Sequence, residues 1–94
     1  MDEMKTESRE EILKRLRRIE GQVKGIQKMI EEDKNCSDIL TQVAAVRAAI
    51  NKTGSLILEK HSMTCIHNAA TAEDKDKAMA ELAKTMQSFM RFVD

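Results

Sequence analysis

Aromatic residues and proline are almost absent from this sequence of 94 residues. It contains no Trp, Tyr or Pro, and its two aromatic side chains are Phe89 and Phe92. Glycine is limited to three residues. Because hydrophobic residues still make up 41% of the chain, this composition favours interlocking aliphatic helices over a β-sheet.

Long apolar runs are missing as well. No stretch approaches the roughly 18 to 20 apolar residues that cross a bilayer, and Met1–Lys5 lacks the apolar core of a signal peptide. We therefore expect a cytoplasmic protein with no membrane partner. In that reducing compartment, the two cysteines are expected to be metal ligands or redox-reactive thiols and not a structural disulfide.

The sequence has no overall excess of charge, since 16 Lys and Arg residues balance 16 Asp and Glu residues. Neutrality excludes a global attraction to nucleic acid or acidic lipid, so any attraction has to be local. Between Ile12 and Lys28, a single acidic residue, Glu20, stands among six basic ones: Lys14, Arg15, Arg17, Arg18, Lys24 and Lys28. On charge alone, this is either a solvated Lys/Arg surface or a phosphate-binding surface.

A first long helix is predicted from the start of this basic segment. Ser8 and Glu11 have the spacing of a capping box, which indicates where the helix begins. The residues before it, Met1–Glu7, are expected to be disordered because they offer little apolar surface to offset the entropy of ordering. The apolar residues of the helix recur every three or four positions: Ile12, Leu16, Ile19, Val23, Ile26, Met29 and Ile30.

A second long helix is predicted after a polar turn. Asn35 is placed to cap it, with Asp38 three residues further on, and the helical pattern extends over Ser37–Ile66. Small residues, Gly54 among them, permit close approach of a neighbouring helix. The apolar stripe of this helix continues at its far end into a histidine and a cysteine: Ile39, Val43, Val46, Ile50, Thr53, Ile57, His61 and Cys65.

A third, shorter helix completes the prediction. His67–Ala70 interrupts the apolar pattern, and Thr71, followed by two acidic residues, is expected to open the helix. Its apolar positions include Ala78, Leu82, Met86, Phe89 and Val93. We therefore predict an all-α fold in a single domain, 1–94, with three helices per chain. The two long antiparallel helices make a hairpin too thin to close its own core, so two chains would form a four-helix bundle.

Cys36, His61 and Cys65 are the candidate metal ligands. Cys36 and His61 are 25 residues apart, which along one helix is roughly 37 Å, so one chain cannot bring them together. His61 and Cys65, four residues apart, share a face. An antiparallel second copy would bring Cys36 of one chain to His61 and Cys65 of the other, twice by symmetry.

Two thiolates and one imidazole are soft to borderline donors. Three such ligands suit trigonal Cu(I), whereas structural Zn(II) usually takes four ligands and catalytic Zn(II) three and a water. Zn(II) remains an alternative. Taken alone, a free cysteine on an apolar stripe is often a small buried hydrophobe, and a lone histidine on a helix is more often an ordinary residue than a ligand. The combination of the three residues on a packing stripe favours a metal site.

The sequence resembles the copper-sensing operon repressor family (CsoR/RcnR type) over roughly Glu10 to Phe92. The resemblance rests on these segments: Arg15–Glu20, Gly21–Val23, Cys36, Gln42–Arg47 and the pair His61 and Cys65. It implies an all-α dimer of antiparallel helix hairpins, usually doubled to a tetramer as a dimer of dimers. Such a protein binds operator DNA without metal and releases it when metal binds.

The resemblance also implies roles for individual residues. Cys36 from one subunit and His61 with Cys65 from the other would bind the metal. The combination points to Cu(I), because the other branches of the family differ at these positions. Nickel and cobalt sensors carry His at position 65, formaldehyde sensors lack a Cys at position 65, and persulfide sensors lack the His at position 61. Glu81 matches a position near the ligands that is linked to signalling. Asn35 stands beside the ligands where copper sensors often have Tyr.

The expected contacts with DNA come from the family resemblance and from the charge pattern. Arg15 matches a DNA-contact position of the family, and Lys52 stands where a basic residue is also implicated. Charge alone adds Lys14, Arg17 and Arg18. Because no helix-turn-helix, zinc finger or stacking aromatics are visible, we expect clamping of phosphates and recognition of DNA shape instead of base readout.

The sequence thus predicts a homodimeric or homotetrameric repressor that Cu(I) releases from operator DNA, derepressing copper efflux or homeostasis genes. One alternative is a thiol or persulfide switch in which Cys36 and Cys65 of partner subunits react. Others are a sensor of another metal, such as Zn(II), or a metal store. An enzyme is not expected, because no nucleophile, base and oxyanion arrangement is recognisable.

Overall fold

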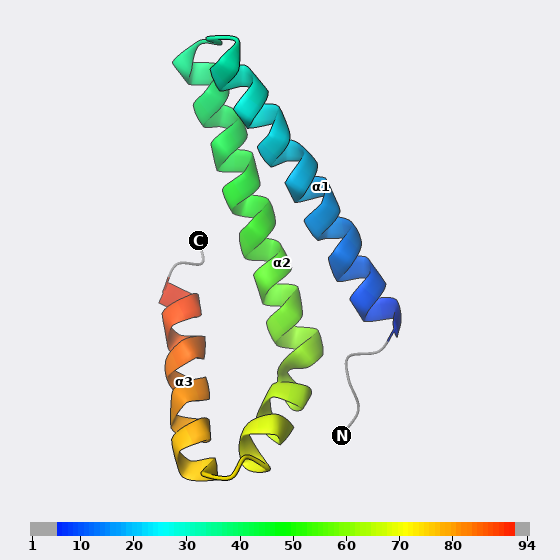
Figure 1. The fold of residues 1–94 in the computed structure, drawn as a ribbon, viewed down its shortest axis with the longest axis vertical. Helices are drawn as coiled ribbons and strands as arrows, with labels where there is room; N and C mark the ends of the chain where they lie inside the picture. Colours follow the sequence, from blue (N-terminus) through cyan, green and yellow to red (C-terminus); the bar gives the residue numbers. More distant parts are fainter. Residues whose placement is uncertain (1–5, 92–94) are drawn as a thin grey trace.

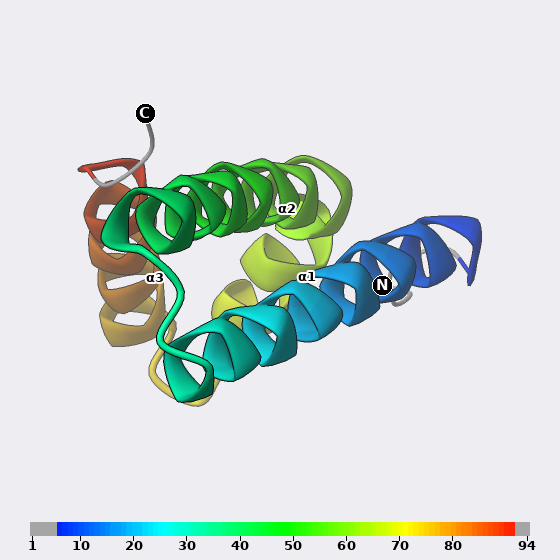
Figure 2. The same cartoon turned by 90° about the horizontal axis from the view of Figure 1, so that it is seen from above.

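Three helices make up the computed structural model, which describes residues 6–91. They are α1 (Thr6–Glu31), α2 (Cys36–Ala70) and α3 (Lys75–Arg91), and no strand occurs in that range. The predicted all-α fold with three helices is confirmed. In Figure 1, α1 and α2 form a long antiparallel hairpin, and α3 folds back along the other side of α2. Both α1 and α3 pack on α2, and Figure 2 shows that the three helices do not lie in one plane.

Helix α1 begins slightly earlier than the capping-box spacing indicated. It starts at Thr6, so Thr6 and Glu7 are helical and not part of a disordered segment. The rest of that predicted segment, 1–5, lies outside the described residues. Ile12 and Ile19 are buried against α2, whereas Val23 and Ile30 of the same predicted stripe are 40% and 59% exposed. The apolar stripe of α1 is therefore wider than the single helix α2 covers.

The turn between α1 and α2 is closed by the backbone and by one side chain. Asp33 adopts a left-handed conformation with φ 55°, which Asp tolerates better than most residues. The N–H of Lys34 donates to the carbonyl of Met29 at 3.0 Å, which ends α1. As predicted, Asn35 caps α2: its Oδ1 accepts from the N–H of Asp38 at 2.9 Å, and its Nδ2 donates to the Asp38 carboxylate at 3.0 Å.

Replacing Asn35 with alanine should lower the free energy of unfolding by about 1 kcal/mol, because the amide of Asp38 loses its acceptor at the exposed start of α2. Asn35→Ser is the matched control, since a serine oxygen also accepts at this position. Chemical denaturation at one fixed protein concentration measures both variants. Equal destabilisation by both substitutions would show that the cap contributes nothing.

The far end of α2 corrects two boundaries. The helix continues through His67–Ala70 instead of ending near Ile66, and α3 begins at Lys75 instead of Thr71. Thr71 belongs to the end of α2, because its N–H and its hydroxyl both donate to the carbonyl of His67 at 3.0 Å. Asp74 supplies the N-terminal cap of α3, where its Oδ1 accepts from the N–H of Lys77 at 3.1 Å. Thr71 therefore ends α2, and Asp74 caps α3.

The core of the single chain is thin. Among the residues that the structure describes, the buried hydrophobic ones are Ile12, Ile19 and Ala69. The buried polar ones in the same range are Thr53, whose hydroxyl donates to the carbonyl of Ala49 at 2.8 Å, and Thr64. Within α3 itself, no side chain is fully buried. Large apolar side chains remain exposed along α2: Leu40, Val43, Ile50, Ile57, Met63 and Ile66. None of the helices within residues 6–91 has the length and apolar character to cross a membrane.

Candidate metal centre and nucleic-acid interface

Helix α2 carries all three candidate metal ligands. Cys36 is its first residue and is exposed, whereas His61 and Cys65 are half-buried near its other end. The 25 residues from Cys36 to His61 correspond to roughly 37 Å of helix, so these two residues of one chain do not share a site. Accordingly, no three Cys, His, Asp or Glu side chains of residues 6–91 are grouped so that they could hold a metal ion.

The Nδ1 atom of His61 is buried and has no hydrogen-bond partner among the described residues. A buried polar atom left unpaired costs free energy, which a bound partner would recover. A neutral imidazole nitrogen with a free lone pair is a metal donor. His61 therefore fits the ligand predicted at this position, with Cys65 one turn further along the same face.

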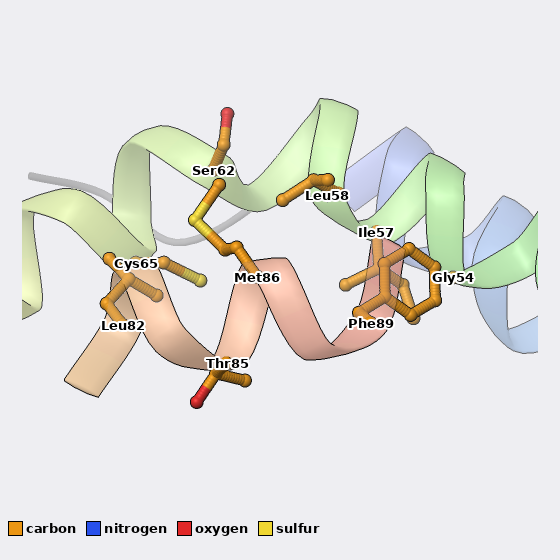
Figure 3. A pocket seen from close by; sticks show the side chains of 9 residues that line it. All are labelled: Gly54, Ile57, Leu58, Ser62, Cys65, Leu82, Thr85, Met86 and Phe89. Carbon is orange, nitrogen blue, oxygen red and sulfur yellow. The ribbon is translucent and has the colours of Figure 1, made fainter. Parts of the chain in front are cut away.

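Cys65 lines an apolar cavity of about 320 Å³ between α2 and α3 (Figure 3). Helix α2 contributes Gly54, Ile57, Leu58, Ser62 and Cys65, and α3 contributes Leu82, Thr85, Met86 and Phe89. The free thiol of Cys65, which is half-buried, thus lies at the seam between two helices. Helical spacing predicted that Met86 packs, but not that it shares a cavity with Cys65, because that depends on how α3 is placed along α2.

Gly54 determines how closely α3 approaches α2. A Cβ atom built on Gly54 would lie 2.6 Å from both Cε1 and Cζ of Phe89, a distance that no real Cβ contact allows. The expectation that Gly54 permits a close helix approach is confirmed for this pair of helices. The contact closes one end of the cavity that contains Cys65.

Two residues were predicted to act beside the ligands. Asn35 is engaged as the cap of α2, so its amide orients the first turn that carries Cys36. Glu81 is an exposed residue of α3 and precedes Leu82, which lines the Cys65 cavity. The structure therefore places Glu81 on the helix that covers Cys65, and Asn35 at the opposite end of α2.

The basic residues of α1 fall on two different faces. Lys14, Arg17 and Arg18 are exposed, and their helical positions turn them away from the side that packs on α2. Arg15 is half-buried, and its Nη2 lies 3.7 Å from Oε2 of Glu11. Lys52 is exposed on α2. The three residues predicted from charge alone therefore lie on the outer face of α1, whereas Arg15 lies at the edge of the contact between α1 and α2.

Arg15 shares one feature with Gln22, a residue that the sequence marked only as part of the segment Gly21–Val23. The Nε of Arg15 is buried without a hydrogen-bond partner among residues 6–91, and the same is true of Oε1 of Gln22, seven residues further along α1. This spacing places both side chains on the face toward α2. The sequence contained one indication of this, because Gln22 follows Arg15 by seven residues, or two helical turns, and so lies on the same face of α1.

Comparisons with known proteins identify close similarities over nearly the whole chain. Residues 8–88 match the family described as "Metal-sensitive transcriptional repressor". The sequence is 40% identical over 86 residues to the copper-sensing transcriptional repressor CsoR of Bacillus subtilis (strain 168), covering 92% of this chain and 85% of that protein. It is 42% identical over 88 residues to the copper-sensing transcriptional repressor RicR of Mycobacterium tuberculosis (strain ATCC 25618 / H37Rv), covering 94% and 91%.

Two solved structures resemble the fold. The copper-sensing repressor CsoR with Cu(I) from Geobacillus thermodenitrificans NG80-2 superposes with a TM-score of 0.75 at 39% identity, over 96% of this chain and 94% of that chain. The nickel-responsive transcriptional regulator InrS superposes with a TM-score of 0.63 at 34% identity, over 95% and 97%.

Proposed function

This chain belongs to the metal-sensitive transcriptional repressors, and from that premise we propose that it is a Cu(I)-responsive repressor, bound to operator DNA without metal and released by Cu(I). Membership in this family implies DNA binding and makes the protein a regulator and not an enzyme. The similarity to two copper-sensing repressors and to a Cu(I)-bound one favours copper over other metals. We place the protein in the cytoplasm and its regulated genes among those for copper efflux or homeostasis.

The observation that carries the proposed metal site is the Nδ1 of His61, which is buried and has no hydrogen-bond partner within residues 6–91. It lies one turn from the free thiol of Cys65, and Cys36 would complete the donor set from a second chain. When bound, Cu(I) would draw these three soft to borderline donors together, and trigonal coordination by two thiolates and an imidazole suits Cu(I) better than Zn(II). The metal site would then bridge two subunits, with Cys36 from one and His61 with Cys65 from the other.

A second chain is supported by what the single hairpin leaves uncovered. Val43, Ile50 and Ile57 are each more than one-third exposed, and their spacing of seven residues puts them on one face of α2. A contiguous apolar face of this kind indicates an interface. We propose an antiparallel pairing of α2 helices in a four-helix bundle, which forms the dimer and, by pairing of dimers, a tetramer.

The proposed DNA surface is the outer face of α1. Lys14, Arg17 and Arg18 are exposed there, and symmetry repeats the face on each subunit, so it can span several phosphates of a duplex. Arg15 and Lys52 complete the proposed contacts. Because α1 packs directly on α2, a shift of α2 that brings Cys36 toward the partner's ligands also moves the basic face. Asn35 is proposed to hold the first turn of α2, which carries Cys36, and Glu81 is proposed to hold α3 in place over His61 and Cys65.

Cu(I) titration of the reduced protein on DNA tests the function. The metal-free protein first selects a duplex from a random-sequence library, and fluorescence anisotropy then follows the complex under anaerobic conditions. We expect Cu(I) to weaken DNA binding by roughly 5- to 150-fold, the usual range of coupling between two sites. Zn(II) added at the same concentration is the control. DNA affinity that Cu(I) leaves unchanged would contradict the proposal, and release by Zn(II) alone would reassign the metal.

A further inference from the structure

We propose that Cys65 and Met86 form a Cu(I) capture site within a single chain, which shares only Cys65 with the three-residue site that requires two chains. The inference rests on the proposed function, because it takes Cu(I) as the metal that reaches Cys65. It assigns a purpose to a cavity and to a methionine that the repressor mechanism does not use.

The two sulfur side chains come from different helices and line one cavity. Cys65 belongs to α2 and Met86 to α3, and Figure 3 shows both side chains among those that line the cavity between the two helices. Gly54 and Phe89, in close contact, hold α3 against α2 at one end of the cavity. The placement of Met86 opposite Cys65 is thus a consequence of how α3 docks.

Methionine is a frequent gap-filler, so the other methionines of the described residues matter for comparison. Met63, Met79 and Met90 are 62%, 39% and 56% exposed, and none of them lines this cavity. Met29 lies on α1. Among residues 6–91, Met86 is therefore the thioether that shares a cavity with a thiol.

The charge balance of the pair selects a monovalent soft ion. Thiolate and thioether are both soft donors that prefer Cu(I). On binding, the Cys65 thiol gives its proton to bulk water, and one thiolate with one Cu(I) ion is neutral overall. A neutral complex enters an apolar cavity at far lower cost than a charged one. Zn(II) bound to the same pair would keep a positive charge and lack the further ligands it requires.

The capture site shares Cys65 with the proposed sensing site. His61, one turn away, offers a nitrogen that no hydrogen bond occupies in the described part of the chain, and Cys36 of a second chain would supply the other thiolate. Cu(I) held by Cys65 and Met86 can pass to the three-residue site by exchanging the thioether for the imidazole and the second thiolate, with Cys65 bound throughout. The pair would thus let one chain acquire the ion before the intersubunit site closes.

Selenium labelling provides a direct test. The full chain carrying Cys36→Ser, which disables the intersubunit site, is produced with selenomethionine and given one equivalent of Cu(I) without oxygen. X-ray absorption at the copper edge should then show selenium bound to copper. Adding Met86→Leu, which keeps the apolar volume, should remove that signal, whereas adding Met79→Leu, two turns away on α3, should leave it unchanged. Retention of Cu(I) against a soluble Cu(I) chelator should fall about 10-fold or more with Met86→Leu.

A copper spectrum without selenium in the labelled Cys36→Ser protein would overturn the capture site, and this spectrum decides the matter even if a leucine variant folds poorly. A selenium signal that survives Met86→Leu would overturn it as well. The proposed function fails by a different result, because it is measured as DNA release from the wild-type protein. A wild-type protein that releases DNA with Cu(I) while Cys36→Ser shows no selenium neighbour would leave the repressor intact and remove only the capture site.

Discussion

Substituting Cys36 with serine is expected to abolish the release of DNA by Cu(I) and to leave metal-free DNA binding within about two-fold of wild type. The residue is exposed at the first position of α2 and takes no part in the core, so serine should not disturb the helix. It would remove one of the two thiolates, and the subunits would lose the ligand that joins them. Anisotropy titrations with and without Cu(I) measure both quantities for each variant.

Ser37→Ala is the matched control for Cys36→Ser, because it changes the adjacent exposed residue in the same turn without touching a proposed ligand. It should respond to Cu(I) like wild type. A Cys36→Ser protein that still releases DNA would remove Cys36 from the metal site. His61→Ala separates the copper mechanism from thiol chemistry, since a disulfide or persulfide switch between Cys36 and Cys65 would survive that substitution and a Cu(I) site of three ligands would not.

Much of this architecture follows from local signals in the sequence. The cap at Asn35 and the spacing of apolar residues on α1 and α2 were sufficient to predict the helical hairpin. The predicted end of α2 at Ile66 was wrong, because His67–Ala70 interrupts the apolar pattern while the helix continues to Ala70. Ala69 is buried there, so tertiary packing stabilises one more turn than the pattern indicated.

The candidate site was predictable where it depends on one helix and not where it depends on two. The placement of His61 and Cys65 on one face of α2 follows from their spacing alone. The cavity with Met86 depends on the position of α3, which the turn after Thr71 and the contact of Gly54 with Phe89 determine. Neither feature leaves a periodic signal in the sequence. The pairing of Cys36 with a second chain is a property of the assembly and stays a prediction.

Arg15→Ala is expected to lower metal-free DNA affinity by at least about 10-fold at low salt, the larger part of the effect coming from a lost charge-assisted contact with phosphate. Arg15 is half-buried at the helix seam, with its guanidinium 3.7 Å from Glu11, so its side chain is more restrained than those of the exposed basic residues. A restrained cation loses less entropy on binding than a free one. Binding isotherms over a series of salt concentrations measure the effect.

The salt series distinguishes a phosphate contact from a structural role. Each subunit of a symmetric assembly contributes the same residue, so Arg15→Ala should reduce the slope of log affinity against log salt by about two for a dimer on B-DNA. Lys84→Ala removes one positive charge from the exposed surface of α3 and should leave the slope unchanged. Arg18→Ala removes a charge from the outer face of α1. If Arg18→Ala lowers the slope and Arg15→Ala does not, the outer face binds the phosphates and Arg15 serves the seam between α1 and α2.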